Sequence, residues 1–199
     1  MVFNKNQLYI LKKTKRYVKD YMKKINDVSH DYKHIKLVVK FSLKIAKKEK
    51  IYNSRDLFHI RMGALLHDIG DHKYTNENQE NVLFKFLNKF NKLDKNDRHE
   101  IIEIASNVSL SKEDGRVNNK LDIVKDADRI NSLGSIGIMR YISYNIKNSD
   151  EPSFEEIIRN IRDRTKKIRL YLKTRTGKKI SKKHLRLIRL FIKNYKEFS

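Results

Sequence analysis

Apolar residues recur along most of this chain at the three- and four-residue steps of amphipathic helices. The apolar stripes fall within residues 8–25, 34–45, 58–66, 82–93, 154–172 and 185–195. Ser153 and Glu156 form a capping-box pattern before the fifth stripe, and Gly177 breaks the pattern before the last. With only six glycines and one proline in 199 residues, the sequence predicts an all-α fold.

The first two stripes show which side chains face the core. Leu8, Leu11, Val18, Met22 and Ile25 share one face of the first predicted helix. The second stripe is His34, Val38, Phe41 and Ile45, which places a histidine among core residues. Ser54 is the expected N-cap of the third helix, which runs through Phe58 and Met62 to His67.

Positive charge is concentrated at the two ends of the chain. The formal net charge is +22, with +6 on residues 1–28, +12 on 155–199 and +4 on the segment between. We expect one domain over 1–199, in which 1–28 is a basic N-terminal helix and 153–199 a basic helical extension. The basic ends suit a nucleic-acid partner. An A/T-rich genome also explains this Lys-, Asn- and Ile-rich composition, and we favour that explanation.

The composition also excludes several kinds of functional site and bears on where the protein is located. The chain has no cysteine, so disulfides, thiolate metal sites and cysteine nucleophiles are excluded. No apolar stretch approaches a membrane span, and lysines interrupt the N-terminus where a signal sequence would be apolar. We therefore expect an intracellular, cytoplasmic protein without membrane contact. The sequence does not fix its oligomeric state.

Histidines and aspartates recur in a pattern that suits metal binding. His34 lies on an apolar stripe, His67 and Asp68 end another, and Asp128 lies in an Asp-Ala-Asp-Arg run further on. Taken singly, each has an ordinary explanation as a packed histidine, a cap or a surface acid. Together they form a ligand set of two imidazoles and two carboxylates, typical of Mn²⁺, Fe²⁺, Co²⁺ or Ni²⁺. The pattern predicts a metal-dependent hydrolase.

These residues and their neighbours resemble the HD-domain phosphohydrolase superfamily. The similarity is greatest to a subgroup of small single-domain HD hydrolases from bacteria, fungi and large viruses, and it extends over roughly residues 28–198. Its motifs here are Ser29 to His34, Ala64 to Tyr74, Val124 to Ile130, Leu133 to Arg140 and Thr174 to Lys179. The resemblance implies a helical bundle with one divalent metal ion in its core. Mn²⁺ is the preferred ion, with Fe²⁺, Co²⁺, Ni²⁺ or Mg²⁺ as alternatives.

The resemblance also implies a role for each candidate residue. The metal ligands are His34 rather than His30, His67, Asp68, and Asp128 rather than Asp126. Asp71 is the catalytic carboxylate that orients water or shuttles a proton. The substrate-binding candidates are His30, Lys73, Arg129 and Arg140; Asp126 is a further candidate near the ligands.

The expected activity is hydrolysis of a phosphate ester or anhydride, with a nucleotide as substrate and either pyrophosphohydrolase or nucleotidase action. Two positions depart from the subgroup, because Leu37 stands where Arg is usual and Asn131 where Asp is usual. Neither removes a ligand. The alternative function is a basic nucleic-acid-binding protein with a structural or vestigial metal site, and Tyr171 and Tyr195 could stack on bases.

Overall fold

In the computed structural model, which describes residues 3–27, 30–113, 115 and 118–198, the chain forms helices and no strand over those residues. Ser29, the first residue of one motif above, lies outside them. The elements are α1 (Lys5–Ile25), α2 (Tyr32–Lys48), α3 (Ser54–Leu66), α4 (Gln79–Leu87), α5 (Lys95–Ser106), the 3-10 turn η2 (Leu110–Lys112), α6 (Asn119–Asn131), α7 (Gly134–Asn148), α8 (Phe154–Tyr171) and α9 (Arg175–Phe198). The predicted all-α class is confirmed. None of the described helices is long and apolar enough to cross a membrane.

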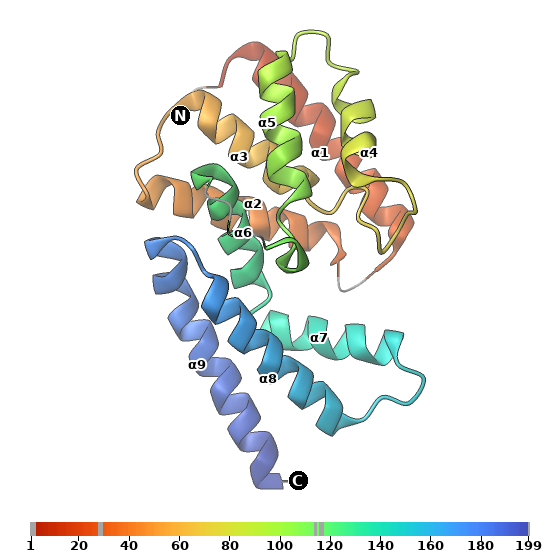
Figure 1. Cartoon of the computed structure of the whole chain (residues 1–199), viewed down its shortest axis with the longest axis vertical. Helices are drawn as coiled ribbons and strands as arrows, with labels where there is room; N and C mark the ends of the chain where they lie inside the picture. The colour runs from red at the N-terminus through yellow and green to blue at the C-terminus, as the bar shows by residue number, and fades with distance from the viewer. Residues whose placement is uncertain (1–2, 28–29, 114, 116–117, 199) are drawn as a thin grey trace.

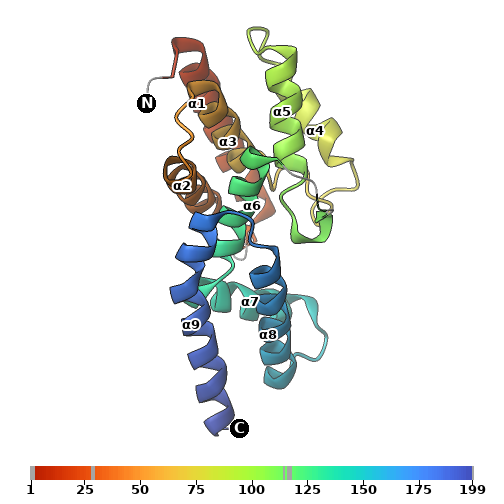
Figure 2. The ribbon, with the colours of Figure 1, turned by 60° about the vertical axis from the view of Figure 1, so that its left-hand side comes forward.

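The helices enclose two apolar clusters. The larger one is built by α1 to α6, with α2 lying across α3 and α6. The smaller one is built by α7, α8 and α9 around Ile138, Ile161 and Ile188. Figure 1 shows α1, α3, α4 and α5 in the upper half, α7 to α9 in the lower half, and α2 and α6 between them. Figure 2 shows the same division from another side.

Local signals explain most helix boundaries. The Ser153 hydroxyl accepts a hydrogen bond from the Glu156 N–H at 3.2 Å, as the predicted cap requires. The cap of α3 was misplaced by one residue, because the Asn53 side chain accepts from the N–H groups of Arg55 and Asp56 and Ser54 is the first helical residue. Asparagine satisfies these N–H groups as well as serine does.

Two predicted core positions are exposed. Leu8 is 52% exposed and Phe154 67% exposed, whereas Ile10 takes the buried position at the start of α1. On a helix with about 100° per residue, Leu8 lies about 90° from the centre of the buried stripe, at its edge. Phe154 is the first residue of α8. In both cases the prediction fails at the first residue of an apolar stripe.

Candidate metal centre

Three helix ends bring the predicted ligands together. His34 is the third residue of α2, and its N–H donates to the capping carboxylate of Asp31 at 2.9 Å. His67 and Asp68 follow the last residue of α3, and Asp128 lies in the last turn of α6. Adjacent residues inside a helix diverge by about 100°. The end of α3 is therefore what allows neighbouring His67 and Asp68 side chains to face one point.

The turn after α3 is held from both sides. Gly70 adopts a left-handed backbone (φ 71°), and a Cβ added there would lie 3.0 Å from the Val82 side chain. The Gln79 side chain donates to the carbonyls of His67 (2.8 Å) and Ile69 (3.2 Å). The chain therefore reverses sharply after Asp68 and leaves both ligand side chains pointing inward.

Side-chain atoms of the four predicted ligands converge at the centre of this site. His34 Nε2 lies 3.2 Å from His67 Nε2, 3.4 Å from Asp68 Oδ2 and 3.4 Å from Asp128 Oδ1. His67 Nε2 lies 3.4 Å from Asp68 Oδ1 and 3.9 Å from Asp128 Oδ1. His34, His67 and Asp68 alone already form a compact, buried group able to hold a metal ion. Asp128 borders that group from α6.

Two further observations fit a cation at this point. The His67 ring places Nδ1 3.0 Å from the carbonyl of Ala64, so Nδ1–H donates there and Nε2 keeps its lone pair. Asp68 Oδ2 is buried and makes no hydrogen bond of good geometry to any described residue. A buried carboxylate oxygen without a donor is costly. A divalent cation would satisfy it.

Protonation states also favour a cation. Burial lowers the pKa of the His34 imidazole, which keeps the ring neutral. Burial alone would raise the pKa of the Asp68 carboxyl, but the charge of His67 and the contact with His34 lower it well below its usual range. The same balance, with His34 and His67 opposing burial, lowers the pKa of Asp128. A neutral His34 imidazole and ionised carboxylates at Asp68 and Asp128 are forms that bind metals.

A family comparison agrees with this arrangement. Residues 31–133, more than half of the chain, match the model of the HD domain. The chain belongs to the HD-domain family. This confirms the resemblance to the HD-domain phosphohydrolase superfamily. All four predicted ligands lie inside the matched segment, on helices α2 and α6 and in the turn after α3.

Proteins and solved structures that are similar to this HD-domain chain come from a virus and from bacteria. It is 30% identical over 141 residues to the uncharacterized protein L803 of Acanthamoeba polyphaga mimivirus. The aligned region covers 64% of this chain and 58% of the viral protein. Its fold is similar to an HD-superfamily hydrolase of Bacillus thuringiensis (TM-score 0.74, 23% identity, 96% and 97% covered). It is also similar to YpgQ of Bacillus subtilis in complex with ADP (TM-score 0.75, 19% identity, 94% and 96% covered).

A cavity opens beside the ligands of the HD domain. It has a volume of 50 Å³ next to the ligands and continues into a space of 130 Å³ between α7 and α8. Both spaces are lined by His30, Lys73 and Arg140, three of the predicted substrate-binding residues. Asp71 lines the part next to the ligands and accepts a hydrogen bond from the Lys73 N–H at 3.0 Å. Burial lowers the pKa of His30 to about 4, so this ring is neutral near pH 7.

The structure does not bring Arg129 or Asp126 to this cavity. The Arg129 guanidinium is buried, pairs with Glu113 and donates to the Tyr171 carbonyl. The Asp126 carboxylate accepts from the backbone N–H groups of Lys173 (2.9 Å) and Thr174 (2.7 Å). On helix α6, positions 126 and 129 lie on the face toward α9 and the α8–α9 connection, whereas position 128 faces the ligands. Both side chains thus hold the helical extension in place.

Sequence reasoning missed three residues of the site. Arg164 of α8 lines both parts of the cavity, and its guanidinium lies 5.6 Å from the centre of the Tyr141 ring. Asn131 contacts His34 Nδ1 at 2.6 Å, and Gln79 holds the turn after α3. Nothing in the pattern distinguishes Arg164 from the other cations of its segment. Asn131 stood out only as a departure from the related sequences.

Proposed function

We propose that this HD-domain protein is a divalent-metal-dependent phosphohydrolase that acts on a nucleotide, as a nucleoside triphosphate pyrophosphohydrolase or a nucleotidase. One observation carries the proposal. The buried group of His34, His67 and Asp68, with the partly buried Asp128 carboxylate beside it, opens onto a cavity lined by the cations Lys73, Arg140 and Arg164. Metal ligands beside clustered cations are what phosphoryl chemistry requires.

The ligands of the ion would be His34, His67, Asp68 and Asp128. When bound there, a divalent ion supplies Lewis acidity and a more acidic water. Asp71, 9% exposed and bordering the same cavity, is placed to orient an attacking water or to hold its proton. Its Oδ1 is held by the Lys73 N–H, and Lys73 Nζ lies 3.9 Å from Oδ2. The carboxylate is therefore fixed in one orientation toward the cavity.

The cations favour a phosphorylated anion as the substrate. Lys73 comes from the loop after α3, Arg140 from α7 and Arg164 from α8, so positive charge meets the cavity from three directions. Such a ring offsets negative charge that develops on phosphate oxygens. Tyr141 and Tyr144 line the same space and offer ring faces to a nucleobase. The Bacillus subtilis neighbour with ADP bound gives the nucleotide class further support.

The test is hydrolysis of a nucleotide panel by the purified protein with Mn²⁺. Release of phosphate and of pyrophosphate is measured separately from mono-, di- and triphosphates. We expect Asp68→Ala to abolish turnover, whereas Asp20→Ala, which removes an exposed acid of α1, leaves turnover unchanged. Equal turnover by the wild type and Asp68→Ala would contradict the proposal. Pyrophosphate release identifies the pyrophosphohydrolase, and phosphate release from a monophosphate identifies the nucleotidase.

A further inference from the structure

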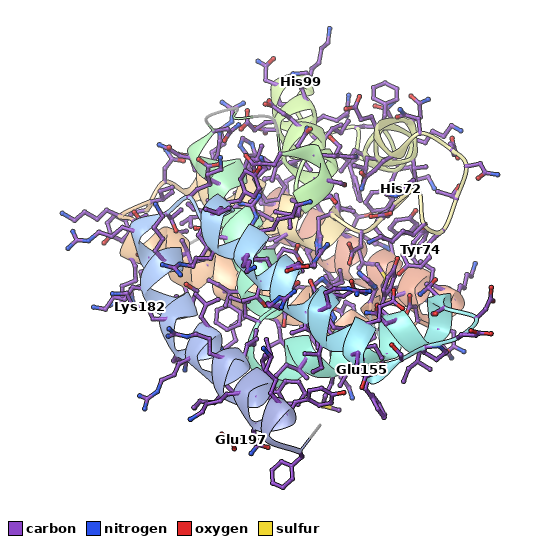
Figure 3. The ribbon with its side chains drawn as sticks, turned by 60° about the horizontal axis from the view of Figure 1, so that its bottom comes forward. His72, Tyr74, His99, Glu155, Lys182 and Glu197 are labelled. Atoms are coloured by element: carbon purple, nitrogen blue, oxygen red, sulfur yellow. The ribbon has the colours of Figure 1, made fainter. Side chains whose placement is uncertain are left out.

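A groove with basic rims runs between α8 and α9, apart from the metal centre. Its volume is 910 Å³, and it shares no lining residue with the cavity beside the ligands. Eight of its lining residues are Lys or Arg, and no acidic residue of the described chain lines it. Figure 1 and Figure 2 both show α8 and α9 side by side, and Figure 3 shows long side chains such as Lys182 projecting from α9.

The floor of the groove is aliphatic. Leu172 and Ile188 line it and are buried, while Leu185 and Ile192 line it and are partly buried. The groove thus combines an apolar floor with charged rims. No aromatic ring is among its lining residues.

The cations follow helical spacing on both rims. Arg162, Lys166 and Arg169 stand at steps of four and three residues on α8. On α9 the corresponding rim is formed by Lys178, Lys182, Arg186 and Arg189, at steps of four, four and three. At 1.5 Å per residue the α9 rim is about 16 Å long, about three helical turns. Asp163 pairs with Arg162 and Lys166 and offsets part of the positive charge of the α8 rim.

We propose that this groove binds an acidic amphipathic helix of a partner protein. An apolar stripe at three- and four-residue steps would pack on the floor, and Asp or Glu on both flanks would meet the two rims. The basic rims favour an anionic partner, and the aliphatic floor favours an anionic partner that has an apolar face. A single-stranded nucleic acid gains from stacking on aromatic rings, which this floor lacks. A vesicle surface is too flat to reach the floor of a concave groove.

The probe is a labelled 18-residue peptide with Leu at heptad positions a and d, Glu at e and g, and Ala elsewhere. A scrambled peptide of the same composition has the same charge without the apolar stripe. Binding to the full chain is followed by fluorescence anisotropy at about 0.15 M salt, where surface charges are partly screened. We expect saturable binding of the amphipathic peptide and at least tenfold weaker binding of the scrambled one.

Matched variants separate the groove from the general charge of the protein. Lys178→Glu, Lys182→Glu and Arg186→Glu together should weaken binding at least tenfold. The triple change Lys12→Glu, Lys19→Glu and Lys23→Glu on the exposed face of α1 alters net charge equally and should leave binding within about twofold. All six side chains are exposed, so we expect the helical circular dichroism to be kept. If the first triple variant loses it, Lys182→Glu alone is used and should weaken binding at least twofold.

Several results would overturn the proposal. No binding of the amphipathic peptide, equal binding of the scrambled peptide, or equal losses in the two triple variants would each do so. A labelled oligothymidylate of the same charge that binds more tightly, with a steep dependence on salt, would assign the groove to nucleic acid instead. Nucleotide hydrolysis is expected to stay unchanged in the groove variants, because no groove residue lines the catalytic cavity.

Discussion

One ring nitrogen of His34, Nε2, faces the ligand cluster. The other, Nδ1, faces two polar side chains. Its Nδ1 lies 2.6 Å from the Asn131 amide and 2.7 Å from Arg140 Nη1. An imidazole that binds a metal through Nε2 carries its proton on Nδ1 and needs an acceptor there. A carboxamide can present its oxygen after a rotation, and the guanidinium cannot. In the structure the Asn131 amide nitrogen faces Nδ1 and also donates to the His34 carbonyl at 3.4 Å. Once rotated, the amide oxygen would accept from Nδ1–H, as would the carboxylate that is usual at this position in related sequences.

Asn131→Leu should weaken metal binding without removing a ligand. Loss of a partner that orients a ligand typically lowers metal affinity by about 10- to 100-fold. Calorimetric titration with Mn²⁺ measures this directly. Asp71→Asn is the comparison, because it should lower turnover and leave Mn²⁺ affinity nearly unchanged. Unaltered affinity in Asn131→Leu would show that Asn131 does not position His34.

Arg164 should contribute to substrate binding rather than to metal binding. Removing a charge-assisted contact with phosphate costs about 1.5 kcal/mol or more, which is about tenfold in kcat/KM. We expect Arg164→Gln to raise KM for a triphosphate by about this factor and to change Mn²⁺ affinity little. The control is Arg159→Gln, an exposed change on α8 that touches none of the cavities described above. Equal KM and kcat values for Arg164→Gln and wild type would show that Arg164 does not bind the substrate.

At the scale of elements, α6 joins the two apolar clusters. One face of its last turns carries Asp128 toward the ligands, and another carries Asp126, whose carboxylate accepts from Lys173 N–H, Thr174 N–H and the Thr174 hydroxyl. Gly177 in the first turn of α9 lies against the same carboxylate, since a Cβ there would be 2.2 Å from Asp126 Oδ2. Contact between α6 and α9 thus depends on the absence of a side chain.

Gly177→Ala should destabilise the fold, because the added methyl group must displace a buried, hydrogen-bonded carboxylate. Overpacking of this kind typically costs about 1–3 kcal/mol. Urea denaturation followed by circular dichroism gives the change in the free energy of unfolding. Lys179→Ala, two residues further along and exposed, is the control and should shift it by less than about 0.5 kcal/mol. An unchanged free energy of unfolding in Gly177→Ala would show that α9 can move away from α6 without loss of stability.

The sequence was sufficient for most of the helices and for the ligand cluster, because both depend on local pattern. The six apolar stripes correspond to α1 to α4, α8 and α9, and the fixed order of His34, His67, Asp68 and Asp128 identified the convergent cluster. Arg164 could not be found this way, because it reaches the cavity only through the packing of α8. Arg129 was placed wrongly for the same reason, since one step of about 100° around α6 separates it from Asp128. Direction around a helix depends on neighbours that local spacing does not reveal.

At the scale of the whole molecule, a buried ion cluster ties the segment after η2 to α6 and to the α8–α9 connection. The Glu113 carboxylate pairs with Arg129, lies 3.4 Å from Lys125 Nζ and lies 2.7 Å from Lys173 Nζ. Its side chain is 4% exposed. The neighbouring residues Ser109 and Leu110 line the cavity beside the ligands. The ion cluster therefore supports one wall of the candidate active site.

Glu113 should make the free energy of unfolding depend on pH in the acidic range. Burial alone would raise the pKa of the Glu113 carboxyl, but hydrogen bonds from Lys173 and Arg129 lower it from 4.5 to about 2. A group whose pKa is depressed on folding stabilises the native state above its unfolded pKa, so this contribution is complete above about pH 5 and is lost progressively as the pH falls to about 2. The shift corresponds to roughly 3 kcal/mol.

Glu113→Gln should therefore lower the free energy of unfolding by about this amount at pH 7, and the difference from wild type should shrink as the pH falls to 2. Urea titrations across this range measure the difference. Glu197→Gln, which removes an acid from an exposed pair with Lys193, should change stability by less than about 1 kcal/mol at every pH. A constant difference between Glu113→Gln and wild type from pH 7 to 2 would show that the buried cluster does not set the acid dependence.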